Sequence, residues 1–346
     1  MAADLRLGLN TGYWSGGPPP GAQEAVIEAD RLGFDSIWTA EAYGSDVLSP
    51  LAWWGSRTER VRLGTAIMQI SARTPAAAAM AAMTMDHLSG GRFILGLGVS
   101  GPQVVEGWYG QPFGKPLART REYIAILRAI WAREGPVTFD GEHYHLPLEG
   151  GTGLGKPLKS SIHPLREDIP IFLGAQGPKN VALAAELCDG WSALFFSPHH
   201  EGFYRDALSE GFARDGARRS FADFEVMATV PLVIDDDVER AADALRPMYA
   251  LYFGGMGARD RNFHADVPRR MGYEADVERI QEAYLSGRKD EAAALVPTSL
   301  VEQLALVGPP DKIRHDLEAW RSSLVTTLLV GGDAAHLRRI AEIVLG

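Results

Sequence analysis

The chain has 346 residues, of which 46% are hydrophobic and 23% are charged, the composition of an ordinary globular protein. The net charge of −10, with no clustered basic run, argues against a nucleic-acid partner, and the single cysteine, Cys188, excludes an internal disulfide and a cysteine-rich metal site. Because the chain has neither a signal-peptide pattern nor an apolar run of membrane-spanning length, we expect a soluble cytoplasmic protein with no metal and no membrane contact.

Short apolar runs alternate with helix-length segments along the chain. In the first part, the pattern predicts strands at residues 5–11, 34–41, 61–68 and 93–99, and helices at residues 21–32, 50–58, 75–88 and 117–133. In the second part, it predicts strands at residues 169–173, 191–196, 225–234 and 326–330, and helices at residues 180–187 and 334–344. Strands that are apolar throughout are typical of buried parallel sheets. This order predicts the α/β class and a (β/α)8 TIM barrel, with residues 1–346 as one domain.

Two stretches interrupt the alternation. Residues 135–168 contain the string FDGEHY, whose Asp-Gly pair is typical of a hairpin turn, and continue as a loop rich in Gly, Lys and Pro. Residues 240–310 have a mostly helical pattern and are too long for one connection. We expect both stretches to be insertions in the barrel, the second of them covering the active site.

In a barrel of this type, functional groups lie at the C-terminal ends of the strands. Glu41 follows the second predicted strand, where a carboxylate either serves the site or pairs with a neighbour, and its position favours the site. Four aromatic residues near the strand ends would wall a flat ligand or pack under a lid: Tyr13, Trp14, Trp108 and Tyr109.

The stretch from residue 168 to 198 predicts a strand, a glycine turn, a helix and a second strand. The turn reads GAQGP (residues 174–178), and free backbone N–H groups at a helix N-terminus form a site for an anion such as a cofactor phosphate. The alternative is a plain turn in which glycine serves geometry alone. Lys179 at the start of the helix, with Lys156, Lys159 and Arg166 before the strand, would suit a polyanionic ligand tail or form a solvated surface.

Four strings occur in a fixed order along the chain: SIWTAE (residues 36–41), VRLGTA (61–66), DHLSGGRFILGLG (86–98) and GAQGPKN (174–180). In this order, and nearly end to end, the chain resembles the bacterial luciferase-like superfamily, and within it the coenzyme F420-dependent oxidoreductases. The resemblance implies a (β/α)8 barrel that binds F420, a 5-deazaflavin, at the C-terminal mouth.

The resemblance also implies which residues hold the cofactor. Its phosphate would lie on the backbone of residues 174–179, its tail would run toward the basic loop, and a non-proline cis peptide in a bulge of strand three, at Ala66–Ile67, would back the ring. The implied cofactor-binding set is Glu41, Ala66, Ile67, Gln69, Val99, Ser100, Gly174, Ala175, Gln176, Gly177, Pro178, Lys179 and Asn180.

The chain departs from one branch of this family. The F420-dependent glucose-6-phosphate dehydrogenases carry a His directly after the acid of strand two and a Glu after strand four, where this chain has Ala42 and, approximately, Gly101. We therefore do not expect glucose 6-phosphate to be the substrate. Our catalytic candidates are Glu41, Glu106 and Tyr109, the last two as replacement proton donors.

We expect an enzyme that transfers a hydride between the deazaflavin C5 and a small or medium organic substrate. One alternative is an FMN-dependent monooxygenase of the same superfamily, against which Lys156 and Lys179 favour F420. Another is a deazaflavin-binding protein without turnover, since the usual acid and base are missing. The resemblance further suggests a homodimer, for which Trp53 and Trp54 would supply either a contact or buried core.

Overall fold

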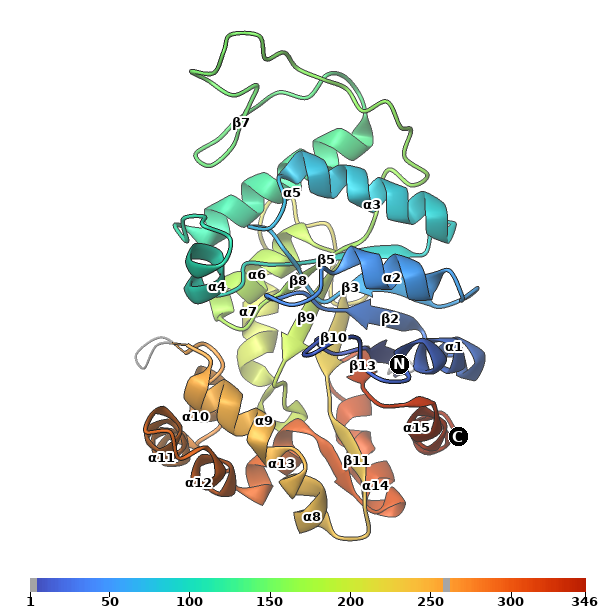
Figure 1. The fold of residues 1–346 in the computed structure, drawn as a ribbon, viewed down its shortest axis with the longest axis vertical. Helices are drawn as coiled ribbons and strands as arrows, with labels where there is room; N and C mark the ends of the chain where they lie inside the picture. The colour runs from blue at the N-terminus through green and yellow to red at the C-terminus, as the bar shows by residue number, and fades with distance from the viewer. Residues whose placement is uncertain (1–4, 258–261) are drawn as a thin grey trace.

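The computed structural model describes residues 5–257 and 262–346 (Figure 1). Within these residues eight parallel strands form a ring, which closes where the third strand pairs with the fourth. The strands in ring order are β1 (Arg6–Asn10), β2 (Ser36–Thr39), β3 (Arg62–Thr65) with its continuation β4 (Met68–Gln69), β5 (Phe93–Gly98), β8 (Ile171–Gly174), β9 (Gly190–Leu194), β10 (Glu225–Thr229) and β13 (Thr327–Val330). The predicted (β/α)8 barrel is thus confirmed.

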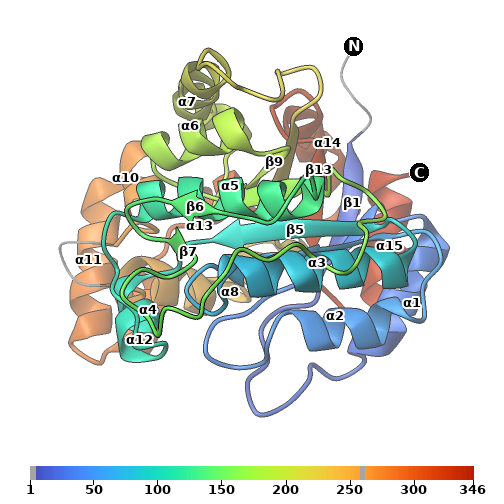
Figure 2. The same ribbon diagram turned by 90° about the horizontal axis from the view of Figure 1, so that it is seen from above.

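Helices surround the barrel, as Figures 1 and 2 show. The outer helices are α1 (Ala22–Leu32), α2 (Leu48–Gly55), α3 (Pro75–Ser89), α5 (Pro116–Ala132), α6 (Pro178–Leu187), α7 (Gly202–Phe212), α14 (Pro310–Arg321) and α15 (Ala334–Val344). Local sequence sets their ends: α3 begins where Thr74 caps the backbone N–H of Ala77 and Pro75 occupies the first turn, and it stops at Gly90, whose φ is +64°. No helix in the described ranges combines the length and the apolar content needed to cross a bilayer.

The seventh predicted strand, residues 225–234, is wrong as one continuous element. It stops at the end of β10, and β11 (Leu232–Ile234) leaves the barrel to pair with β12 (Leu306–Gly308) in a separate two-stranded parallel sheet. Pro231 lies at the break, and because proline has no N–H to donate, a central barrel strand cannot continue through it. The sequence pattern also gave no sign of β12.

The region between β10 and α14 is mostly helical, as the pattern predicted. Its helices are α8 (Val238–Asp243), α9 (Arg246–Ala250), the π-helix η2 (Leu251–Gly255), α10 (Asp266–Arg270), α11 (Glu274–Leu285), α12 (Lys289–Ala294) and α13 (Thr298–Leu304). They share a second hydrophobic cluster, which Phe195, directly after β9, joins from the barrel side. The predicted bounds, 240–310, leave out β11 and the start of α8.

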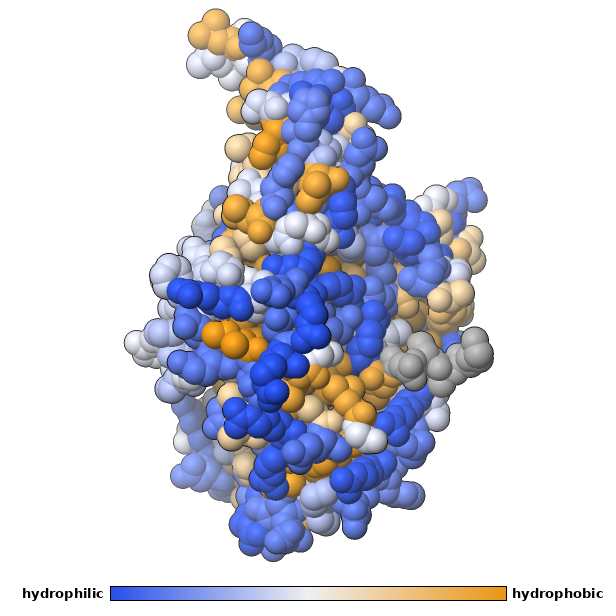
Figure 3. Space-filling view, turned by 90° about the vertical axis from the view of Figure 1, so that its right-hand side faces the viewer, coloured by the Kyte–Doolittle hydropathy of each residue, from blue (hydrophilic) through white to orange (hydrophobic). Residues whose placement is uncertain are grey.

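Three short elements lie in the remaining connections: α4 (Pro102–Gly107), the hairpin of β6 (Phe139–Asp140) with β7 (His145–Leu146), and the 3-10 helix η1 (Pro198–His200). The hairpin is antiparallel, as the Asp-Gly turn predicted. The segment that carries it projects at the top of Figures 1 and 3, and Figure 3 shows a mostly hydrophilic face with scattered apolar patches.

Large side chains fill the barrel interior. Trp38 and Phe172, with ring centroids 5.5 Å apart, form a cluster with Met227, Leu329 and Ile94. Space for the indole comes from strand three, where a Cβ added to Gly64 would lie 2.3 Å from the Trp38 ring. The interior therefore depends on one large residue facing one residue without a side chain.

Below this cluster, at the N-terminal end of the barrel, charged residues close the interior. Glu225 accepts from Arg6 (2.5 Å) and from Arg62 (2.8 Å), and Arg62 also pairs with Asp35 (2.6 Å). Burial acts to raise the pKa of Glu225, but the two guanidinium groups outweigh it and hold that pKa below its usual value. The charged groups at this end of the barrel are therefore paired with one another.

Gly64→Ala should destabilise the protein by about 1–3 kcal/mol, because the new methyl group forces the Trp38 ring or the strand to move. Urea unfolding followed by circular dichroism would measure the difference. The matched control is Gly114→Ala, since a Cβ there meets no atom within 4 Å, and its stability should change by less than about 1 kcal/mol. Equal stabilities for the two variants would contradict this account of the interior.

Candidate functional site

Small residues and one isoleucine form the floor of the barrel mouth. A Cβ built on Gly98 would lie 2.6 Å from the Ile67 side chain, and one built on Gly174 would lie 3.0 Å from it. Ile67 therefore lies across the ends of β5 and β8. A residue larger than glycine at position 98 or 174 would displace the Ile67 side chain. The result is an apolar floor of the kind that a planar ring can lie against.

Strand three bulges at this floor. Four residue steps from 64 to 68 lie opposite three steps on β5, from 94 to 97, so one extra residue is accommodated. The Ala66–Ile67 peptide bond inside the bulge is cis. The Thr65 hydroxyl holds the bulge to β5, since it donates to the Gly96 carbonyl (2.8 Å) and accepts from the Gly96 N–H (2.9 Å).

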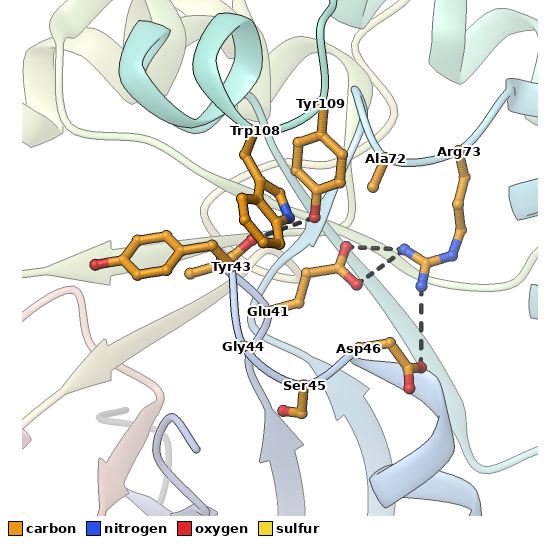
Figure 4. A pocket seen from close by; sticks show the side chains of 10 residues that line it. Glu41, Tyr43, Gly44, Ser45, Asp46, Ala72, Arg73, Trp108 and Tyr109 are labelled. Carbon is orange, nitrogen blue, oxygen red and sulfur yellow. Dashed lines mark hydrogen bonds and ion pairs between the residues drawn. The ribbon is translucent and has the colours of Figure 1, made fainter. Parts of the chain in front are cut away.

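Glu41 lies at the centre of a hydrogen-bond network, which Figure 4 shows in part. Its carboxylate, buried directly after β2, accepts from the N–H groups of Val47 (3.1 Å) and Gln69 (3.0 Å) and from Arg73 Nη1 at 2.8 and 2.9 Å. Arg73 also lies 3.9 Å from Asp46. A carboxylate offers about four acceptor positions, so groups of the chain itself fill those of Glu41.

A pocket of about 230 Å³ opens above this ion pair. It is lined by Glu41, Ala42, Tyr43, Gly44, Ser45, Asp46, Ala72, Arg73, Trp108 and Tyr109 (Figure 4). The Tyr109 hydroxyl donates to the Ala42 carbonyl (3.2 Å). Burial raises the pKa of the Tyr109 phenol, the Glu41 carboxylate adds to this effect, and Arg73 opposes it. A neutral phenol that can donate a proton or hydrogen bond thus lies beside a guanidinium.

The turn between β8 and α6 offers free donors. Gly177 is the N-cap of α6 without a side-chain cap, and the backbone N–H groups of Gln176, Gly177 and Lys179 have no acceptor among the described residues. A Cβ on Gly177 would meet nothing within 4 Å, so the space in front of the turn is open. The Asn180 Oδ1 atom beside it is buried without a partner. The free N–H groups fit a phosphate, whereas the Asn180 Oδ1 atom is an acceptor and would need a donor.

The structure brings some of the predicted site residues together and separates others. Val99 and Ser100 follow β5 at the mouth, and Ser100 has a φ of +58°, a conformation uncommon for a residue with a side chain. Gln69 is buried beside Glu41, with its Oε1 unpartnered. Glu106, by contrast, is an exposed residue of α4 that accepts from the Phe113 N–H (3.3 Å) and does not line the pocket.

The prediction that Arg166 helps to bind the tail of a ligand is wrong. This guanidinium pairs with the buried Asp86, near the end of α3, and donates to the carbonyl of Phe93, the first residue of β5. Both partners lie at the N-terminal end of the barrel, opposite the mouth. Lys156 and Lys179 are exposed.

Sequence reasoning missed two residues at this end of the barrel, Arg73 of the pocket and Phe195, which follows β9. Arg73 directly precedes the capped N-terminus of α3 and follows strand three. Because the acid after strand two lies next to it in the barrel, this position could have indicated an ion pair. Phe195 gave no such signal: it follows β9 with a φ of +59°, a conformation rare for a bulky residue, and its ring contacts Tyr252 of the insertion at 5.1 Å.

Comparison with known proteins agrees with this architecture. The family model described as luciferase-like monooxygenase matches residues 8–327. A Mycobacterium tuberculosis protein provisionally named coenzyme F420-dependent oxidoreductase Rv3520c is 59% identical over 347 residues, covering 99% of this chain and 100% of the relative. The 5,10-methylenetetrahydromethanopterin reductase of Archaeoglobus fulgidus is 29% identical and is covered over 86% of its length by 88% of this chain.

Among solved structures, the F420-dependent tetrahydromethanopterin reductase of Methanopyrus kandleri superposes with a TM-score of 0.81 at 23% identity. The match covers 99% of both chains. At this identity the superposition supports the fold.

Arg73→Met should cost about 3–5 kcal/mol of stability, because it leaves the buried Glu41 carboxylate without its countercharge. Denaturant unfolding would measure the loss, with Arg57→Met as control, since Arg57 is an exposed arginine. The double variant Glu41→Gln with Arg73→Met should recover a large part of the loss. Equal stabilities of the Arg73 and Arg57 variants would show that the ion pair does not hold the mouth together.

Proposed function

Because the chain belongs to the luciferase-like monooxygenase family, we propose that it is a coenzyme F420-dependent oxidoreductase that transfers a hydride to or from a small or medium organic substrate. The open turn before α6 supports a cofactor that carries a phosphate, since its free backbone N–H groups suit that anion. The choice of F420 rests on the relative that is 59% identical over nearly the whole chain.

The proposed cofactor-binding residues fall into two groups. Residues 174–180 would hold the phosphate, with Lys179 placed to meet a negatively charged tail. Ala66, Ile67, Gln69, Val99 and Ser100 would contact the ring and the chain that follows it. When bound, the deazaflavin supplies hydride chemistry at its C5 atom. The chain's own part is to orient this ring on the apolar floor and to limit the access of water.

We assign Glu41 a positioning role. Its four hydrogen bonds fix the segment after β2 against strand three and hold the Arg73 guanidinium under the pocket. Tyr109 is the proposed proton donor, since its hydroxyl lines the pocket and stays protonated at neutral pH. Glu106, three residues earlier on α4, is a second proposed donor, which would need α4 to turn toward the pocket.

Two rival functions make different predictions. An FMN-dependent monooxygenase would use the same phosphate turn and differ in cofactor preference. A deazaflavin-binding protein without turnover would bind F420 and leave it unchanged with every substrate. The pocket beside Tyr109 favours an enzyme, because an open cavity with a proton donor gives room for a substrate.

We also propose a cytoplasmic homodimer. Helices α2 and α3 lie side by side in Figures 1 and 2. Trp53 of α2 is 66% exposed and Met80 of α3 is 61% exposed, whereas Trp54 is only 5% exposed and packs in the core. Large apolar side chains left exposed on adjacent helices are typical of a contact between subunits. Of the two tryptophans, therefore, Trp53 is the proposed contact residue.

Titration of the purified protein with F420 and with FMN, followed by tryptophan fluorescence, tests the cofactor. We expect tighter binding of F420 and a loss of at least about a hundredfold in Gly177→Asp, whose carboxylate would cap α6 and occupy the phosphate position. Gly177→Ala is the matched control and should retain most of the affinity. Stronger binding of FMN would favour the monooxygenase, and binding of neither cofactor would refute the proposal.

Replacing Trp53 and Met80 together with Glu should convert the dimer to a monomer, because two charges would then be buried at the contact. Size-exclusion chromatography with light scattering reads the mass directly. Leu285→Glu, at an exposed leucine of α11, is the control and should leave the mass unchanged. A wild-type monomer, or a dimer that survives both substitutions, would exclude this interface.

A further inference from the structure

A second cavity, of about 300 Å³, lies beside the mouth, between the start of α7 and α10. Phe195 and Ser197 border it where the chain leaves β9, His200 and Phe203 border it at the start of α7, and Arg270 borders it from α10. Because it begins at the C-terminal end of a barrel strand, it lies on the same face of the barrel as the pocket above Glu41. No residue lines both cavities.

Arg270 gives this cavity its charge. Its guanidinium belongs to an exposed residue and lies 4.5 Å from the centroid of the Phe203 ring and 3.5 Å from the Tyr204 hydroxyl, and neither neighbour neutralises it. Within the described ranges, no carboxylate lies within 4.0 Å of Arg270, whereas its neighbour Arg269 pairs with Asp266 at 3.1 Å. A guanidinium without a countercharge is suited to bind an oxyanion in a bidentate manner.

The surrounding groups add to the attraction for an anion. The N–H groups of Gly202 and Phe203, in the first turn of α7, have no acceptor among the described residues and form the positive end of that helix dipole. The nearby acid, Glu201, is already engaged, since it pairs with Arg205 (2.5 Å) and accepts from the Leu324 N–H (2.7 Å). His200 contributes a ring nitrogen, whereas the Ser197 hydroxyl, 3.4 Å from it, donates to Gln303 Oε1 (2.9 Å) and is already engaged.

The remaining walls are apolar. Phe195, Val267 and Met271 also line the cavity. A ligand that fits must therefore combine an oxyanion with an apolar body, and a bare ion would leave these walls unused.

We propose that this cavity binds the anionic group of the substrate, a carboxylate or a phosphate monoester attached to an apolar body, with Arg270 as the residue that recognises it. The inference rests on the proposed function only for the statement that the ligand is the substrate. The binding of an anion at Arg270 is a property of the cavity alone and can be measured without a cofactor.

Calorimetric titration with benzoate, phenyl phosphate and inorganic phosphate, at low ionic strength, tests the site. Phosphate groups could also bind at the turn before α6, so the titrations use Gly177→Asp, in which that turn is blocked. We expect benzoate or phenyl phosphate to bind more tightly than inorganic phosphate, and Arg270→Leu to weaken binding about tenfold or more. Arg269→Leu, whose arginine is already paired, is the control and should bind like its parent.

Each outcome decides the proposal. Preference for benzoate or for phenyl phosphate identifies the carboxylate or the phosphate ester as the recognised group. Absence of binding, equal affinities in the Arg270 and Arg269 variants, or tightest binding of inorganic phosphate would overturn it. F420 titration of Arg270→Leu in the otherwise wild-type chain should give the wild-type affinity. If F420 fails to bind the wild type while the anions still bind, the proposed function fails and the anion site stands.

Discussion

The rest of the structure depends on how the space inside the barrel is filled. Trp38 occupies the interior because strand three presents Gly64, and Phe172 is accommodated in the same way by Gly190, whose Cβ would lie 2.6 Å from the Phe172 ring. The bulky layer ends at this level, and above it Gly98 and Gly174 leave room only for the Ile67 side chain. The height and flatness of the mouth floor therefore follow from packing below it, before any ligand is considered.

The Glu41–Arg73 pair connects this packing to the site. The carboxylate receives backbone N–H groups from two segments, those of Val47 and Gln69, so one side chain fixes the edges of the pocket on neighbouring strands. Burying such a pair contributes little net stability, but leaving either partner alone is costly, which makes the arrangement specific rather than strong. An acid at the end of a barrel strand can therefore organise the edges of a pocket through its hydrogen bonds alone.

The local sequence pattern was sufficient to predict the strands of the barrel, but not the contacts between segments far apart in the sequence. The apolar runs and glycine turns located all eight barrel strands, because a strand buried on both faces must be apolar throughout. The departure of β11 at Pro231 was readable from the proline, but its pairing with β12, some 70 residues later in the sequence, was not, since that pairing depends on where the insertion folds. Arg166 shows the same limit: its charge was visible, whereas its buried partner Asp86 lies 80 residues away in sequence.

The two proposed anion sites lie at the ends of adjacent strands, the open turn after β8 and the Arg270 cavity after β9. Both offer donors that the chain leaves unpaired, in a protein whose net charge of −10 would repel anions elsewhere on its surface. Because neighbouring parallel strands end side by side, a cofactor phosphate at the first and a substrate anion at the second would be held apart at fixed positions on one face. The apolar body of the substrate would use the apolar walls of the second cavity, and the order of the strands would fix its position relative to the cofactor phosphate.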